Sequence, residues 1–272
     1  MKYLKPAVLI LFIICAAVML YVIVTHETKA DYIVLNETII SCDTNAKKLV
    51  IPRSIDNKVI KSIGNRAFSD NATMISIEVS DGIIELKDEA FYNCSALREI
   101  YLPKSVTYVS PTAFTECQSL SKIEVDIDNR VYESFNGVLF KIGKKELVYF
   151  PVGFIRSEYY IPHGTMIISE KAFYKCPLKT AYIPDTVTRI ENYAFAESIN
   201  METISFPSNL MYLGENVFAG NGKLHSVTIS DGVEIQVNSI GTESFYEQYQ
   251  LNGAGTYMKT GNDQWEYLDK KN

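Results

Sequence analysis

The sequence predicts an α/β-like, β-rich repeat solenoid, and two observations carry this prediction. An Ala-Phe pair recurs along the chain, and its phenylalanines are spaced by 23, 23, 59, 22 and 23 residues. An apolar triplet of the form L-x-x-I-x-L follows most of these pairs, and a proline often closes it. A unit of this size cannot bury its apolar positions alone, so neighbouring units must stack around a continuous core.

The first thirty residues predict an export segment. Lys2 and Lys5 precede an uncharged apolar run of 18 residues, from 7 to 24. A helix of that length rises about 27 Å, which approaches the ~30 Å hydrocarbon core of a bilayer. The run favours a retained anchor that crosses the membrane through residues 7–24, with the basic end inside. A cleaved signal is the alternative, since Thr28-Lys29-Ala30 is a tolerable cleavage site. Either way, we expect an exported chain, anchored at the cell surface or secreted.

Composition excludes several classes of protein. The chain has 272 residues, a net charge of −6 and 47% hydrophobic residues, which argues against disorder and against nucleic acid as a partner. Five cysteines and three histidines are few for a disulfide scaffold or a multi-metal protein. The sequence has no close C-x-x-C pair and no phosphate-cradling glycine loop. We therefore predict no metal site, no cofactor and no enzymatic activity.

Residues 31–240 are the predicted repeat domain. Leu97, Ile100 and Leu102 form the cleanest copy of the triplet, in which Ile100 and Leu102 alternate with an outward residue. This period of two is typical of a strand. Pro103 ends the strand because proline has no N–H to donate. The recurring phenylalanine is expected to enter the core from the opposite wall.

Cys94, Cys117 and Cys176 share one repeat position, three residues after the phenylalanine. Asparagine or serine fills this position in the other copies, so it accepts small residues that bond locally. A free cysteine behaves as a small buried hydrophobe, which predicts a ladder of buried thiols. A disulfide between adjacent copies is the alternative.

The 59-residue gap predicts an insertion at about 127–160. Asn136-Gly137 is a strong signal for a two-residue hairpin turn, and apolar segments follow it at 138–140 and 147–150. We interpret the stretch as a β-hairpin that continues into a β-meander within the array.

Residues 241–272 form a predicted C-terminal tail without repeats. Residues 244–251 predict a short amphipathic helix, and 256–260 and 264–268 predict two strands. An exposed solenoid end needs an atypical unit to cover it, so we expect a cap.

The repeat pattern I-P-x-x-V-T-x-I-x-x-x-A-F-x-x-C-x-x-L resembles the BspA-type leucine-rich repeat of bacterial surface proteins, over about residues 33–240. The resemblance implies a curved right-handed solenoid with a parallel sheet on the concave face. Short strands and turns would then form the convex face. The family often carries a hairpin like the one predicted here, which supports the insertion.

The outward residues of the predicted concave strands are the candidate ligand-binding residues. They are Ser76, Glu78, Glu99, Tyr101, Lys122, Glu124, Thr180, Tyr182, Thr203, Ser205, Ser226 and Thr228. Tyr101 and Tyr182 stand out because tyrosine is favoured at binding hot spots, although cross-strand packing explains them equally well. We hypothesise a non-catalytic, adhesin-like binding protein that recognises a protein or carbohydrate. A structural or envelope-scaffolding protein, with the array as a spacer, is the alternative.

Overall fold

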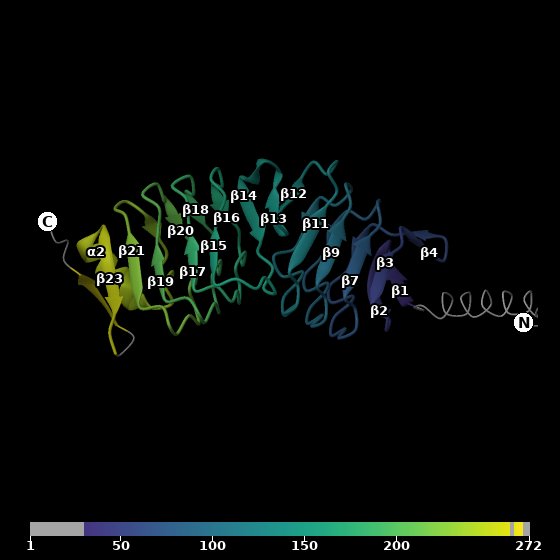
Figure 1. Ribbon diagram of the computed structural model, residues 1–272, viewed down its shortest axis with the longest axis horizontal. Helices are drawn as coiled ribbons and strands as arrows, with labels where there is room; N and C mark the ends of the chain where they lie inside the picture. The colour runs from purple at the N-terminus through teal and green to yellow at the C-terminus, as the bar shows by residue number, and fades with distance from the viewer. Residues whose placement is uncertain (1–29, 262–263, 269–272) are drawn as a thin grey trace, which may run out of the picture.

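The computed structural model describes residues 30–261 and 264–268 (Figure 1). The apolar run at 7–24 lies outside the described residues. Within them, no helix is both long enough and apolar enough to span a bilayer. Successive units stack along one long axis, and the described residues begin and end at opposite ends of the stack.

One side of the solenoid carries the longer parallel strands, and we call it the strand face. In the first half it holds a four-stranded sheet in the order β11-β9-β7-β3, and in the second half the parallel pairs β15–β17 and β19–β21. These strands are β3 (Lys48–Ile51), β7 (Ser76–Val79), β9 (Glu99–Leu102), β11 (Lys122–Val125), β15 (Glu158–Tyr160), β17 (Thr180–Tyr182), β19 (Thr203–Ser205) and β21 (Ser226–Ile229). Ile77, Ile100 and Ile123 are buried in register while their neighbours point outward, which confirms the predicted alternation.

A second series of short strands forms another wall of the solenoid, in two sheets ordered β1-β2-β6-β8-β10 and β12-β13-β14-β16-β18-β20-β22. Their bounds are β1 (Asp31–Leu35), β2 (Thr38–Asp43), β6 (Ser62–Ile63), β8 (Glu85–Leu86), β10 (Tyr108–Val109), β12 (Tyr132–Phe135), β13 (Val138–Lys141), β14 (Glu146–Tyr149), β16 (Ile167–Ile168), β18 (Arg189–Ile190), β20 (Tyr212–Leu213) and β22 (Glu234–Ile235). A small hairpin of β4 (Ser54–Ile55) and β5 (Lys58–Val59) projects near the start. The β-rich solenoid with parallel sheets is confirmed.

The recurring phenylalanines stack into a ladder inside the solenoid. The ring of Phe91 lies 5.2 Å from that of Phe68 and 5.8 Å from that of Phe114. Beside the ladder, Cys94 Sγ donates to the Phe68 carbonyl at 3.0 Å, and Ser198 Oγ donates to the Phe173 carbonyl at 2.9 Å. The four described cysteines are free, and the three at the repeat position are buried. The side chains of Asn71 and Cys117 reach a backbone carbonyl of the preceding unit in the same way, whereas the Cys176 thiol lies 3.3 Å from the Ser198 hydroxyl.

The predicted hairpin is confirmed, and it forms a wall between two hydrophobic cores. Strand β13 pairs antiparallel with both β12 and β14, and the 3₁₀-helix η1 (Ile142–Lys144) connects β13 to β14. Val138 and Phe140 belong to the core of the second half. Leu139 and Tyr132 belong to the core of the first half. Side chains that alternate along β13 thus pack into the two cores on opposite faces of the strand.

The array resumes before the predicted end of the insertion. Phe150 lies 23 residues before Phe173, and their rings stack at 5.0 Å. The Phe150 N–H donates to the Ala172 carbonyl at 2.7 Å, as the Phe91 N–H donates to the Ala113 carbonyl. Strand β15 also lies inside the range 127–160, yet it pairs in parallel with β17. The predicted range of the insertion therefore includes Phe150 and β15, which the structure places in the repeats.

The tail packs on the last repeat. It consists of α2 (Glu243–Asn252), β23 (Gly255–Lys259) and β24 (Trp265–Leu268), which match the predicted helix and strands. Strand β23 pairs antiparallel with β21 and with β24. Phe245, Tyr249, Tyr257 and Trp265 are buried in the core of the second half. Removing the tail would uncover these contacts, which supports the prediction of a cap.

Candidate functional site

The strand face carries all twelve predicted residues, each exposed or half-buried. Strand register aligns Ser76 with Glu99 and Lys122 in one row. The second row holds Glu78, Tyr101 and Glu124. In the second half the aligned pairs are Thr180 with Glu158, Tyr182 with Tyr160, Thr203 with Ser226, and Ser205 with Thr228. The structure thus divides the predicted site into three blocks, on β7–β11, β15–β17 and β19–β21.

In the first block, charged partners hold the side chains. The Lys122 ammonium forms an ion pair with the Glu124 carboxylate. The Tyr101 hydroxyl donates to Asp126 Oδ2 at 2.8 Å, and this bond is the main reason that the pKa of Tyr101 is raised to about 12. The pKa of Asp126 is lowered, first by the Asp128 N–H and then by Tyr101. Tyr101 is therefore a fixed neutral donor, already engaged by its own neighbour.

In the second block, two tyrosines form an exposed stack. The rings of Tyr160 and Tyr182 lie 4.2 Å apart with an interplanar angle of 10°, and the residues are 67% and 42% exposed. Sequence analysis selected Tyr182 and missed Tyr160. The signal was present, since Tyr160 opens the same Tyr-Ile-Pro triplet as Tyr182. It was overlooked because Tyr160 fell within the predicted insertion.

In the third block, the tail extends the strand face. Strand β23 places Thr256 opposite Thr228 and Met258 opposite Ser226. The hydroxyls of Thr228 and Thr256 lie 3.0 Å apart. The candidate surface therefore continues past the repeats onto Thr256 and Met258, which the sequence had assigned to the tail.

The inserted hairpin makes a hollow beside the first block. This hollow, about 610 Å³, is lined by Tyr101, Ser121, Lys122, Glu124, Val125, Ser134, Asn136 and Gly137. The Ile123 N–H donates to the Gly137 carbonyl at 2.9 Å, so the turn of the hairpin lies against β11. Gly137 has a φ of +84°, and a Cβ there would lie 3.2 Å from the Ser121 carbonyl oxygen. The positive φ therefore favours glycine in this turn, and the missing Cβ also avoids a tight contact with β11.

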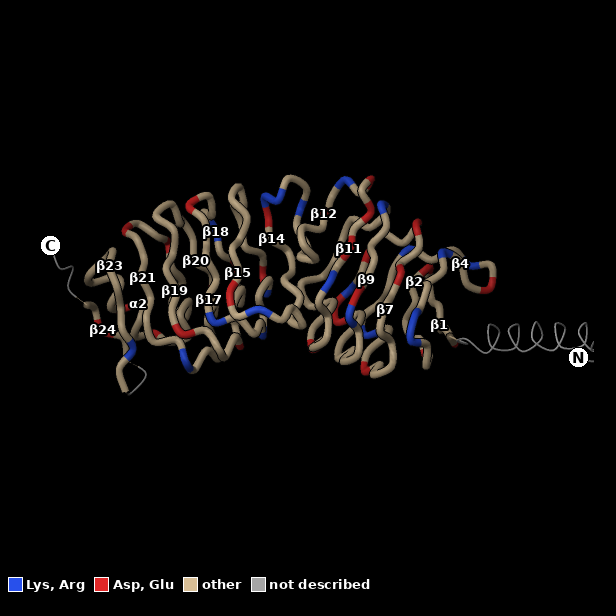
Figure 2. Tube along the Cα trace, in the orientation of Figure 1, with Lys and Arg blue, Asp and Glu red and all other residues tan. Residues whose placement is uncertain are grey.

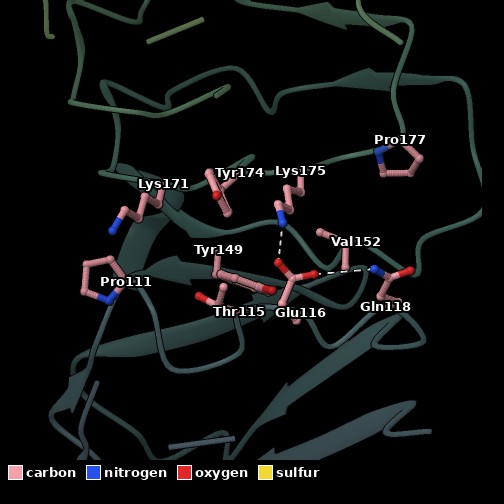
Figure 3. A pocket seen from close by; sticks show the side chains of 10 residues that line it. All are labelled: Pro111, Thr115, Glu116, Gln118, Tyr149, Val152, Lys171, Tyr174, Lys175 and Pro177. Atoms are coloured by element: carbon pink, nitrogen blue, oxygen red, sulfur yellow. Dashed lines mark hydrogen bonds and ion pairs between the residues drawn. The ribbon is translucent and has the colours of Figure 1, made fainter. Parts of the chain in front are cut away.

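A smaller cavity of about 180 Å³ lies between turns of the two halves (Figure 3). The Lys175 ammonium points at the Glu116 carboxylate and forms an ion pair with it across 59 residues of sequence. The Tyr149 hydroxyl donates to the Phe114 carbonyl at 3.1 Å, and burial raises the pKa of Tyr149 well above its ordinary value. The ion pair of Lys175 with Glu116 thus links the two halves at this cavity.

Chemistry-bearing side chains are dispersed over the described residues. Among these residues, no group of three or more His, Cys, Asp and Glu side chains is arranged to hold a metal ion. His163 and His225 are both exposed. Burial raises the pKa of the Cys176 thiol to about 11, which suppresses the thiolate that a nucleophile requires.

Comparison with known proteins decides the family. The profile of the BspA type leucine rich repeat region matches residues 35–151 and 157–256 in six copies. The chain belongs to the BspA-type leucine-rich repeat family. The repeat pattern of the sequence indicated this family, and the parallel sheets that the resemblance implied are present in the structure.

Two solved structures of leucine-rich repeat proteins illustrate the fold. A leucine-rich repeat protein from Eubacterium ventriosum has a TM-score of 0.54 and 20% identity, over 70% of this chain and 61% of its own. A leucine rich cell surface protein from Faecalibacterium prausnitzii has a TM-score of 0.54 and 22% identity, over 73% of this chain and 57% of its own. The chain thus spans about three fifths of each, and the likeness shows the fold. No curated protein matches the sequence.

Proposed function

We propose that the chain is a non-catalytic, adhesin-like binding protein that recognises a protein or carbohydrate partner through the strand face. The observation that carries the proposal is the exposed stack of Tyr160 and Tyr182. The ladder of phenylalanines shows that this fold buries its structural aromatics, whereas these two rings remain accessible to a partner.

The chemistry of the strand face supports recognition. Tyrosine offers a large amphipathic contact area and loses little side-chain entropy on binding, which explains its enrichment at hot spots. Stacking holds each ring of the pair in a defined position before a partner arrives. Thr180 lies on the same strand as Tyr182, and the adjacent strand β19 carries the short hydroxyl side chains of Thr203 and Ser205. This combination suits a flat protein surface or a carbohydrate.

Two further considerations support the place and the nature of this role. The relative from Faecalibacterium prausnitzii is named as a cell surface protein, and residues 1–30 carry the predicted export segment. We therefore propose that the chain is displayed at the cell surface or secreted. Burial of the Cys176 thiol, which suppresses its thiolate, supports binding without catalysis.

The test uses the full chain as bait, against cell-surface proteins and against a glycan array. The double variant Y160A/Y182A should bind the captured partner at least about tenfold more weakly, equivalent to about 1.4 kcal/mol. The matched control is Tyr108→Ala, because Tyr108 is 48% exposed but lies on the short strand β10. Unchanged affinity in Y160A/Y182A would remove the pair from the site. A surface-retained chain that captures no partner would favour the scaffolding alternative.

A further inference from the structure

The strand face is interrupted between β11 and β15, and a groove of about 1070 Å³ lies at the interruption. The segment between β14 and β15 forms one side of this groove. The Gly153 N–H donates to the Leu120 carbonyl at 2.7 Å, and a Cβ on Gly153 would lie 2.4 Å from the carbonyl carbon of Ser119. The segment is therefore seated directly on the turn before β11. We call this space the junction groove.

The junction groove is cationic in an acidic protein. Arg98, Arg156 and Lys179 line it, and no aspartate or glutamate does. Among the described residues, none of these three cations forms an ion pair. Arg156 and Lys179 come just before β15 and β17, where Figure 2 shows blue segments. The net charge of the whole chain is −6, so this concentration of unpaired cations is local.

The groove also exposes apolar side chains between the cations. Ile155 is 99% exposed, and it stands between Phe154 and Arg156 in the sequence. The Arg156 guanidinium lies 5.4 Å from the centroid of the Phe154 ring, so one side chain offers charge beside an apolar surface. Val152 and Pro177 add further apolar lining. A bare anion would use the cations and leave these surfaces without a contact.

One backbone edge is available beside the groove. Strand β15 pairs only with β17 in its two-stranded sheet, so its other edge has no strand partner within the described residues. Exposed edges of this kind accept an extended chain by adding a strand.

We propose that the junction groove binds an extended acidic peptide segment of a protein partner. Carboxylates of the segment pair with Arg98, Arg156 and Lys179, while its apolar side chains cover Ile155 and Phe154. A polyanionic glycan satisfies only the first requirement, so the apolar lining favours a peptide. The inference deepens the proposed function by naming the chemistry of one partner. Its test is separable, because Tyr160 and Tyr182 do not line the groove.

The test measures fluorescence anisotropy of the full chain with a fluorescein-labelled octapeptide of alternating aspartate and leucine. The peptide should bind, and its affinity should fall as salt is raised. The variant R156Q/K179Q should weaken binding at least about tenfold, and Ile155→Ser should weaken it several-fold. The matched control K58Q/K145Q removes the same charge at exposed lysines outside the groove and should leave binding within about twofold.

Three results would overturn the proposal. They are absence of peptide binding, equal binding by R156Q/K179Q and K58Q/K145Q, and tight binding of a heparin oligosaccharide that Ile155→Ser does not change. The last result would assign the groove to polyanionic glycans. If Y160A/Y182A still binds the peptide, the result supports peptide binding in the junction groove, even if other experiments show that the tyrosine pair is not a binding site.

Discussion

Replacing Phe173 with alanine should destabilise the protein by about 4 kcal/mol. Phe173 is fully buried at the centre of the ladder. Its ring stacks at 4.7 Å on Phe195 and at 5.0 Å on Phe150. Removing it leaves both neighbours without their stacking partner and opens a cavity between adjacent repeats.

The magnitude follows from buried area. A buried aromatic side chain removes about 200 Å² from water, which contributes about 5 kcal/mol at 25 cal/mol/Å². Alanine retains about 1 kcal/mol of this through its methyl group, which leaves a loss of about 4 kcal/mol. Measured Phe-to-Ala substitutions in cores cost about 3–5 kcal/mol. This is a large fraction of the 5–15 kcal/mol that stabilises a typical domain.

Urea unfolding of the full chain measures the effect with two probes. Circular dichroism reports on the sheets of the whole array. Fluorescence of Trp265, the single tryptophan, reports on the core of the second half, to which Phe173 also belongs. Because repeats interact mainly with their neighbours, Phe173→Ala should lower both transitions, while Phe91→Ala in the other core should lower the fluorescence transition less.

Phe135→Ala is the matched control, because Phe135 undergoes the same chemical change at 36% exposure on β12. It should cost less than about 1 kcal/mol. A loss below about 1.5 kcal/mol for Phe173→Ala at an unchanged denaturant slope would refute the reasoning. Equal losses for the two variants would also show that ladder burial is not what holds adjacent repeats together.

Two further predictions concern titrating groups. Thiol reagents at pH 8 should leave Cys42, Cys94, Cys117 and Cys176 unmodified in the folded chain, since three are buried and the pKa of half-buried Cys42 is raised to about 12, chiefly by desolvation. All four should react in urea, and rapid labelling of any of these four in the folded chain, located by peptide mapping, would contradict the prediction. The phenol of Tyr101 should titrate near pH 12 in ¹³C-tyrosine NMR, and Asp126→Asn should lower that pKa. Because the folded pKa lies above the usual value near 10, the contribution of Tyr101 to stability is complete below pH 10 and is lost as the pH rises toward 12.

The repeat architecture is local information, so sequence reasoning recovered most of it. A strand period of two fixes which residues of β7, β9 and β11 point outward. The spacing of 23 residues fixes which outward residues become neighbours on adjacent strands, so these rows could be predicted from the sequence alone. The Asn136-Gly137 turn was recognised because few residues tolerate its positive φ angles, which are +52° and +84° in the structure.

Sequence reasoning failed where a repeat departs from its own signature. Phe150 occupies the ladder, but Tyr149 stands before it in place of alanine, so the pair was not recognised. The Tyr149 ring packs edge-on against Phe114 in the core of the first half, with the two ring centroids 5.4 Å apart. Because this repeat was not recognised, β15 and Tyr160 were assigned to the insertion.

By itself, the sequence determined the solenoid, its ladder of phenylalanines and the outward rows of the strand face. These features depend on periodicity, and most copies of the repeat carry the same spaced residues. Only the tertiary structure decided that β13 divides the interior into two cores and that Arg98, Arg156 and Lys179 share one groove. Those residues come from different units, and they meet because the insertion interrupts the sheet. No spacing along the chain encodes the distance across that interruption.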